Sequence, residues 1–400
     1  MSNNHLKSIL IAGGGIGGLT FAICAAQQGH QVTVYEQAPV LRALGAGIQL
    51  SPNAMKVYRA MGLAPQLTRA AFQPQALETR MGVSGRQIFN LPIDAKALEN
   101  WGAPYLHIHR AALVKILHDA LDVLSPKAVQ FSQKLVRYRQ DESGVTVQLQ
   151  SGEIVKADVL IGADGLHSDI RAQMHGPDAP RFTGNAAWRG VVPASRLGDN
   201  VPPPTACVWM GAGRHAVTYQ LGAGDDVNFV GVVETDNEGA EGWMRQGDKA
   251  DALADFTGWQ PDITKLLEQC EASQLFRWAL YDRAPLSHWS EGRVSLLGDA
   301  AHPMLPFLAQ GAAMAIEDSW ALAQNLSRQV NIAAGLKAYE AARLPRTRKV
   351  QARSAGNMKR FHHRSAPAKL LNYGPMWLAG HVAPKIIRSQ FDSLYGYNPL

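Results

Sequence analysis

A glycine cluster near the start of the chain has the spacing of a phosphate-binding turn. Gly13, Gly15 and Gly18 fit G-x-G-x-x-G, between a short apolar run and a stretch with helical spacing. In such a turn the first glycine allows a tight bend, the second lets the backbone approach a pyrophosphate, and the third lets the helix lie close to the strand. Glu36 ends the next alternating run, where a carboxylate can accept hydrogen bonds from a ribose diol. The pattern predicts a dinucleotide site; the alternative is a purely structural turn.

Two further carboxylates follow apolar, strand-like runs. Asp164 lies in GADG and Asp299 in GDAAHP. Taken singly, each could equally cap a helix or stabilise a turn. No second G-x-G-x-x-G follows a strand, and no C-x-x-x-x-C pair occurs, which argues against the disulfide reductases that bind two dinucleotides.

Together these motifs resemble a known family. With GGGIGG at residues 13–18, GADGLHSDIR at 162–171 and LLGDAAHPMLPFLAQGAAMAIED at 296–318, the chain is similar to the single-component FAD-dependent aromatic hydroxylases. Within them it looks most like the branch of salicylate, 3-hydroxybenzoate and 6-hydroxynicotinate hydroxylases. The resemblance spans residue 7 to about residue 355, in the expected order and spacing.

The resemblance implies a monooxygenase that binds FAD and consumes NADH or NADPH and O2, with oxygen added at flavin C4a and then transferred to a small aromatic acid. By resemblance, Glu36 binds the adenosine ribose, Arg110 lies near the phosphates and Asp299 near the ribityl-pyrophosphate region. The full set of expected cofactor residues is Gly13, Gly15, Gly18, Glu36, Arg42, Arg110, Asp164, Asp299, Gln310, Gly311 and Ala312.

Acid–base chemistry is expected from the run RHAVTYQL. On a strand, His215 and Tyr219 face the same side, so both rings could enter one pocket. A histidine with a pKa near 6.5 could accept the proton of a ring hydroxyl at neutral pH. The alternative is a surface histidine and a packed tyrosine. By resemblance, His302 lies beside the flavin as a third catalytic candidate, and Gln49 and Pro303 join the substrate site. Cys207, in an apolar run, is expected in the core, and the alternative is that it reaches the pocket.

The order of the expected strands and helices, which must position these residues, predicts an α/β fold. Residues 7–36 read as strand, helix, strand; residues 129–162 as a small β-meander returning to a parallel strand; residues 181–234 as antiparallel strands; residues 312–328 and 332–356 as helices. We therefore expect a Rossmann-like FAD-binding domain with an inserted, mainly antiparallel substrate domain and C-terminal helices. The expected division is 1–180 and 286–360 for the FAD-binding domain, 181–285 for the substrate sheet and 361–400 for a C-terminal segment without clear periodicity.

Composition limits the other possibilities. The 400 residues are 46% hydrophobic and 18% charged, typical of a folded protein and not of a disordered chain or a coiled coil. A net charge of +6 is small for this length, and the basic runs lack interleaved aromatics, so we expect no nucleic-acid partner. Three scattered cysteines and no membrane-spanning run favour a reducing, cytoplasmic location.

Several alternatives remain at this stage. We expect no metal, because no carboxylate or cysteine completes a spacing around His107, His109, His362 or His363. An FAD oxidase or dehydrogenase that inserts no oxygen, and a non-catalytic FAD-binding sensor, are the competing functions. No G-x-S-x-G elbow or phosphate-binding G-x-x-x-x-G-K loop supports a hydrolase. A homodimer is possible by resemblance alone.

Overall fold

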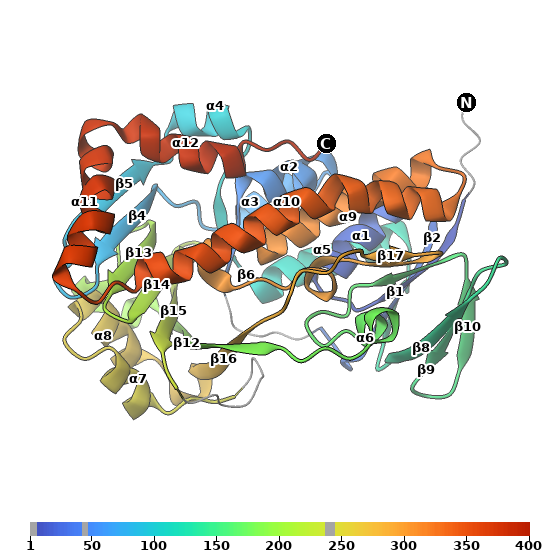
Figure 1. Cartoon of the computed structure of the whole chain (residues 1–400), viewed down its shortest axis with the longest axis horizontal. Helices are drawn as coiled ribbons and strands as arrows, with labels where there is room; N and C mark the ends of the chain where they lie inside the picture. The colour runs from blue at the N-terminus through green and yellow to red at the C-terminus, as the bar shows by residue number, and fades with distance from the viewer. Residues whose placement is uncertain (1–5, 42–46, 237–244) are drawn as a thin grey trace.

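The protein has a mixed α/β fold, seen here in a computed structural model that describes residues 6–41, 47–236 and 245–400. Two sheets lie toward opposite ends of the elongated molecule, and the long helix α10 (Ile332–Phe361) runs between the two ends (Figure 1). One continuous helix therefore packs against elements of both sheets.

The first sheet is mostly parallel, with strand order β17-β18-β11-β1-β2-β7. Its strands are β1 (Ser8–Ala12), β2 (Gln31–Glu36), β7 (Val129–Phe131), β11 (Val159–Gly162), β17 (Ser290–Glu291) and β18 (Val294–Leu296). Strand β1 is almost entirely apolar because it is central in the sheet, and helices pack against it. Helix α1 (Ile16–Gln27) packs against both α5 (Arg110–Leu124) and α9 (Gly311–Arg328). The strand-helix-strand opening predicted from the sequence is present, with β1 and β2 parallel.

The second sheet has seven strands in the order β16-β12-β15-β14-β13-β4-β5. Its strands are β4 (Ala76–Met81), β5 (Gln87–Pro92), β12 (Arg181–Pro193), β13 (Ala206–Gly211), β14 (Arg214–Leu221), β15 (Asp226–Glu234) and β16 (Phe276–Asp282). All neighbours are antiparallel except β13 and β4. The sheet therefore takes in a segment, 76–92, that the division made from the sequence had placed with the first sheet.

One face of this second sheet is closed by helices. Helices α7 (Lys249–Asp255) and α8 (Pro261–Gln269) cover a core that includes Cys207, Trp209 and Phe256. Residue Cys207 alternates with its neighbours along β13, so its side chain belongs to this core, as expected. The opposite face is the one that carries His215 and Tyr219.

Smaller elements connect the two sheets. The predicted meander is β8 (Leu135–Gln140), β9 (Val145–Leu149) and β10 (Ile154–Ala157). A two-stranded ribbon, β3 (Gly47–Leu50) with β6 (Leu106–His109), lies against β14. The other helices are α2 (Pro52–Ala60), α3 (Ala64–Ala70), α4 (Ala95–Trp101) and α6 (Asp169–His175).

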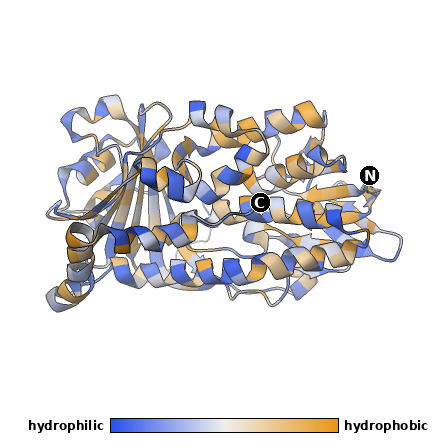
Figure 2. Cartoon of the chain, turned by 90° about the horizontal axis from the view of Figure 1, so that it is seen from above, coloured by the Kyte–Doolittle hydropathy of each residue, from blue (hydrophilic) through white to orange (hydrophobic). Residues whose placement is uncertain are grey.

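The last residues form two helices that the sequence pattern did not reveal, α11 (Ala366–Val382) and α12 (Pro384–Tyr395). Tertiary contacts hold them: Tyr395 packs edge-on against Trp101 with ring centroids 5.2 Å apart, and Gly380 approaches β5 so closely that a Cβ there would lie 2.7 Å from Phe89. Throughout the molecule, hydrophilic and hydrophobic residues are mixed along the helices (Figure 2). Within the described residues, no helix is long and apolar enough to cross a membrane.

Candidate active site

Four segments of the predicted cofactor site leave the same edge of the parallel sheet. Strands β18, β11, β1 and β2 are neighbours in that order, and the chain leaves them at Asp299, Asp164, Gly13 and Glu36 respectively. Carboxyl ends of neighbouring parallel strands meet at one edge, which is where open α/β sheets bind nucleotides. The topology therefore brings together three acids and a glycine turn that lie far apart in sequence.

The three glycines of the turn have different surroundings. Gly13 has φ +103°, and a Cβ there would lie 2.4 Å from the carbonyl oxygen of Ala163. A Cβ on Gly18 would lie 2.0 Å from the carbonyl oxygen of Gly13. Around Gly15, by contrast, a Cβ would meet nothing within 4 Å, although this residue caps helix α1 without a side-chain hydrogen bond. The first and third glycines thus serve packing, and the second leaves open space at a helix N-terminus, which suits a phosphate group.

The carboxylates of Glu36 and Asp164, at this edge of the sheet, differ in their hydrogen bonds. Glu36 accepts a 2.8 Å hydrogen bond from the backbone N–H of Gly14 and another of 2.8 Å from that of Ala38. Asp164 accepts a hydrogen bond of 3.3 Å from the N–H of Ile170, while its buried Oδ1 has no partner among the described residues. Burial raises the pKa of Asp164. An orphaned carboxylate oxygen at this edge fits a site that hydrogen-bonds a ligand hydroxyl.

Asp299 lies beside the start of helix α9. Its side chain is exposed, yet the surrounding protein desolvates the carboxyl enough to raise its pKa, against the opposing charges of His302, Arg110 and Arg171. A Cβ on Gly311 would lie 3.9 Å from Asp299 Oδ1, and α9 begins without a side-chain cap. An accessible acid therefore lies beside a second helix N-terminus.

The other expected cofactor residues fall into three cases. Arg110 is the first residue of α5 and lies within electrostatic range of Asp299. Gln310 is buried, and its side-chain amide donates to Ser51 Oγ at 3.0 Å and accepts from Asn53 at 3.1 Å, so it fixes the start of α2. Gly311 and Ala312, at the α9 N-terminus, are half-buried. Arg42 lies outside the described residues.

A row of half-buried valines crosses the open face of the second sheet. Val208, Val217 and Val230 are cross-strand partners on β13, β14 and β15, and the row ends at Arg189 on β12. Partners of this kind point to the same face. Most other residues of this face are buried, whereas the three valines are only partly covered. The face is therefore incompletely closed along this row.

Arg189 ends that row as a buried cation with no ionic partner in the part of the chain that the structure describes. It is 5% exposed, and its Nε and Nη2 make no hydrogen bond within the described part of the chain. Its guanidinium lies over the rings of Phe276 and Trp278, 5.4 and 5.6 Å from their centroids. Desolvation, followed by the charge of Arg110, lowers its pKa. A buried, unpaired guanidinium is costly, and an anionic ligand would remove that cost.

Tyr219 borders the row on one side, within a cluster of polar rings. Its ring centroid lies 4.7 Å from that of His107, and burial raises the pKa of Tyr219, while it lowers that of His107 to about 3. Tyr105 donates a 2.6 Å hydrogen bond to Oε1 of Gln49 nearby on β3. A Cβ on Gly47 would lie 2.6 Å from the Tyr219 ring, so glycine there lets the ribbon pack against the sheet. At neutral pH, Tyr219 is a hydrogen-bond donor and His107 is neutral.

His215 borders the row on the other side. It lies on the same face as Tyr219, four residues and so about 13 Å away along β14. Its ring packs against Phe307 and Phe361, and its Nδ1 is 2.8 Å from Nε2 of His362. Burial, and then the neighbouring His362, lower the pKa of His215 well below 6.5, so it does not titrate near neutrality as the sequence suggested. It is a neutral base at physiological pH.

His302 is buried, within electrostatic range of Asp299. Its Nε2 pairs with Asp318, which also accepts from Nε of Arg343 at 2.7 Å, and its ring packs against Trp289. Its Nδ1 has no partner in the described ranges. Pro303, which follows it, is half-buried, and its carbonyl accepts from Gln351 at 2.9 Å. The geometry ties His302 to the α9 and α10 helices rather than to the valine row.

Comparison with known proteins decides the family. Residues 7–354 match the family described as the FAD binding domain. The chain belongs to this family. It is 38% identical to 3-amino-4-hydroxybenzoate 2-monooxygenase of Streptomyces platensis over 92% of each chain. It is 36% identical to 6-hydroxynicotinate 3-monooxygenase of Bordetella bronchiseptica over 87% of this chain and 91% of that one. The crystal structure of Klebsiella pneumoniae HpxO complexed with FAD and uric acid superposes with a TM-score of 0.87, at 27% identity, over 98% of this chain and 97% of that one.

These findings confirm the resemblance to the FAD-dependent aromatic hydroxylases, and the protein is an FAD-dependent monooxygenase that uses NAD(P)H and O2. The residues at the strand ends and at the two helix N-termini fit FAD. Sequence reasoning missed Arg189 and His107. A lone arginine within the apolar run AAWRGVV was a signal for the first; His107 had been weighed only as a metal ligand.

Proposed function

We propose that this hydroxylase acts on a small hydroxylated aromatic or N-heteroaromatic carboxylic acid. One observation carries the proposal: the half-buried row of Val208, Val217 and Val230 leads to the guanidinium of Arg189, whose Nε and Nη2 have no partner among the described residues. An apolar strip suits the face of a ring, and a guanidinium suits a carboxylate, because its donors match the two oxygens. A flat ring with one acid group matches both features.

The flanking residues act on the other substituents. The ring lies over Val217 and Val230 with Tyr219 on one side and His215 on the other. Tyr219 donates a hydrogen bond, because its raised pKa keeps it protonated. His215 accepts the proton of the ring hydroxyl, and the resulting phenolate is a more electron-rich ring for attack by electrophilic oxygen. Bound FAD, reduced by NADH or NADPH, supplies that activated oxygen.

The names of the relatives support this substrate class. Both 3-amino-4-hydroxybenzoate and 6-hydroxynicotinate, in the names of two relatives, combine a hydroxyl group and a carboxylate on one ring. A carboxylate held by Arg189 and a hydroxyl facing His215 would accommodate either ring, so the choice between a benzoate and a pyridine acid depends on contacts to the ring itself.

The finer organisation is part of the same proposal. We assign FAD binding to residues 1–180 and 286–360, the substrate sheet to 181–285 with β4 and β5 added, and a supporting role to 361–400. NADH is proposed as the preferred donor, and comparing kcat/KM for NADH and NADPH tests it. A homodimer and a cytoplasmic location also remain proposals; three buried, unpaired cysteines suit a reducing compartment.

The test is a panel of hydroxylated benzoates and nicotinates, scored for stimulated NADH oxidation and for incorporation of ¹⁸O from labelled O2 into the product. We expect at least one acid to give both signals. Stimulated oxidation without label in any product would indicate an oxidase or dehydrogenase, and no stimulation by any acid would indicate a non-catalytic FAD-binding protein. Either result would refute the proposed function.

A further inference from the structure

His215 is the inner end of a chain of hydrogen-bonding groups that leaves the sheet face. Its Nδ1 lies 2.8 Å from Nε2 of His362, whose Nδ1 lies 3.2 Å from Oε1 of Glu234. The three residues come from β14, from the segment after α10 and from the end of β15. Their exposure rises outward: His215 and His362 are 2% and 5% exposed, and the Glu234 side chain is 36% exposed. The chain connects the substrate side of the sheet with solvent.

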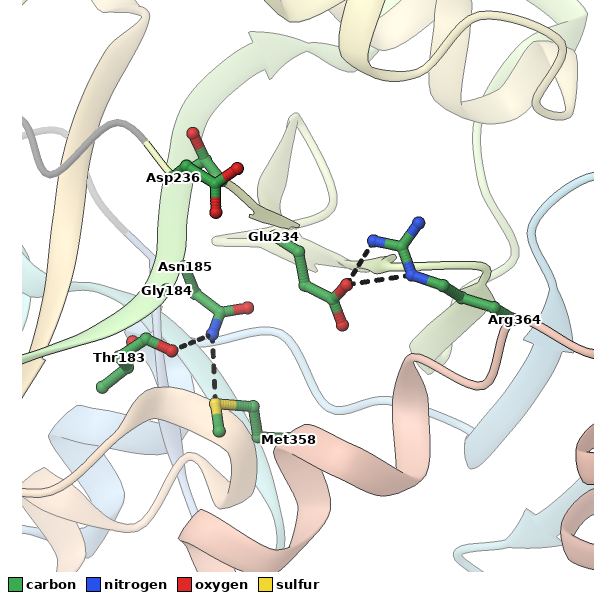
Figure 3. Close-up of a pocket in the computed structure, with 8 residues that line it drawn as sticks. Thr183, Gly184, Asn185, Glu234, Asp236, Met358 and Arg364 are labelled. Atoms are coloured by element: carbon green, nitrogen blue, oxygen red, sulfur yellow. Dashed lines mark hydrogen bonds and ion pairs between the residues drawn. The ribbon is translucent and has the colours of Figure 1, made fainter.

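The outer end opens into a polar recess of about 350 Å³. Figure 3 shows the carboxylate of Glu234 facing the guanidinium of Arg364, whose Nε lies 3.2 Å from Oε2. Asp236 and Asn185 also line the recess, and Asn185 is held by the carbonyl of Thr183 at 2.9 Å. Water in this recess can therefore reach the Glu234 carboxylate.

The carboxylate fixes the direction of the chain. A carboxylate only accepts, so Nδ1 of His362 must carry a proton and donate it to Glu234. Neutral His362 then has a lone pair on Nε2, so Nδ1–H of His215 donates to it. This leaves Nε2 of neutral His215 as the free acceptor, on the ring edge opposite the relay, and it makes no hydrogen bond among the described residues.

We propose that His215, His362 and Glu234 form a proton relay that carries the hydroxyl proton of the bound aromatic acid to the recess at Glu234. The proposal rests on the proposed function. As the substrate O–H bond breaks, an Nε2–H bond forms on His215; its Nδ1–H bond breaks as an Nε2–H bond forms on His362. The Nδ1–H bond of His362 then breaks as Glu234 is protonated, and water in the recess takes the proton. No electrons are transferred.

The electrostatics of the chain support onward transfer. Among the described residues, His362 is the titratable group whose charge acts on His215, and the rings of Phe307 and Phe361 pack beside the imidazole. Burial lowers the pKa of both histidines, so neither keeps an added proton. Partial burial pushes the pKa of Glu234 upward, but Arg364 and His362 outweigh it and lower that pKa, so Glu234 stays ionised and ready to accept.

The experiment mixes oxidised holoenzyme with an accepted aromatic acid in a stopped-flow instrument and follows phenolate absorbance together with a pH-indicator dye. We expect His362→Ala and Glu234→Gln to slow proton release at pH 7 about 10²-fold or more. Added imidazole should restore the rate in His362→Ala, by occupying the vacated space. Asp236→Asn, which removes an acid from the same recess, is the matched control and should keep the wild-type rate.

Two outcomes separate the proposals. If wild-type enzyme hydroxylates an acid but both relay variants release the proton at the wild-type rate, the relay is wrong and the proposed function stands. If no acid is hydroxylated, the proposed function fails, and ¹⁵N NMR of histidine-labelled protein tests the chain directly. The relay requires Nδ1–H on His362 in the wild type and a changed tautomer balance in Glu234→Gln; an Nε2–H tautomer in the wild type would overturn it.

Discussion

Replacing Arg189 with methionine should remove recognition of the substrate carboxylate while the fold persists. Methionine keeps most of the apolar stem that packs against Phe276 and Trp278. The two donors that lack partners among the described residues, Nε and Nη2, can each make a charge-assisted hydrogen bond, worth about 1.5 to 3 kcal/mol. Losing both should cost about 3 to 6 kcal/mol in binding, which raises KM for the acid roughly 10²- to 10⁴-fold.

The same change should barely alter stability. The unpaired, buried guanidinium costs the free protein about 1 to 3 kcal/mol in desolvation, and its two cation–π contacts return about 0.5 to 2 kcal/mol in total. The two effects nearly cancel, so we expect Tm of Arg189→Met to stay within about 3 °C of the wild type for a chain of this size. A large loss of affinity without a loss of Tm would distinguish recognition from unfolding.

The assay compares each acid with its carboxamide for wild type, Arg189→Met and Arg189→Lys. Wild type should strongly prefer the acid, and the methionine variant should not discriminate between them. Lysine keeps the charge but cannot present the planar fork, so it should fall between the two. If Arg189→Met weakened the acid and the carboxamide equally, the carboxylate would not be at Arg189 and the reasoning would be refuted.

The remaining predictions concern the cofactor turn, the pocket tyrosine and acid stability. Gly15→Val should lose FAD with little change in apoprotein Tm, and FAD retained by this variant after gel filtration would contradict the assignment. Gly18→Ala should instead lower apoprotein Tm, because its Cβ would lie 2.0 Å from a carbonyl oxygen. Tyr219→Phe removes one hydrogen bond, so KM and H2O2 formed per NADH should rise modestly; unchanged coupling of NADH oxidation to product would place its hydroxyl outside the site. Because the folded-state pKa of His107 is about 3, stability is lost as pH falls below about 6.5, by about 2 kcal/mol between pH 7 and pH 5 for this residue. Urea unfolding of His107→Asn at the two pH values should show a loss smaller by that amount, and an equal loss would contradict it.

The cofactor edge could be predicted from sequence because each of its parts is local. A glycine turn or an acid directly follows each apolar strand, and parallel pairing then brings the four strand ends together. The side chain of Gln310 shows where such reasoning ends. Its motif places the backbone near the cofactor site, but the amide group is committed to Ser51 and Asn53, some 260 residues earlier in the chain.

The arrangement of the proposed substrate face could not be predicted from the sequence of a single strand. That His215 and Tyr219 share a face follows from alternation alone. That Arg189 ends a row through Val230 and Val217 depends on the register of β12, β15 and β14, and cross-strand register is set by turns and by burial of the whole sheet. The partner of His215 was hidden for the same reason, since His362 follows a helix about 150 residues later.

The charges of the two sites are linked through Arg110. It lies within electrostatic range of Asp299 at the cofactor edge and of Arg189 at the substrate face, where it lowers the pKa of that guanidinium. If an FAD phosphate lies at Arg110, as the resemblance implies, and the substrate carboxylate lies at Arg189, as proposed, each anion reduces this repulsion. Each anion then changes the free-energy cost of charge at the other's site. Direct repulsion between the two anions opposes this favourable coupling, but the positive charges of Arg110 and Arg189 screen that repulsion. We therefore expect FAD to strengthen binding of the aromatic acid, with a coupling of about 1 kcal/mol that falls as salt is added. Titration calorimetry of the acid into apoprotein and holoprotein at two salt concentrations measures it. A coupling that does not depend on salt would assign the effect to packing rather than to these charges. The same calorimetry on Arg110→Gln is the second test, because the coupling should vanish in that variant.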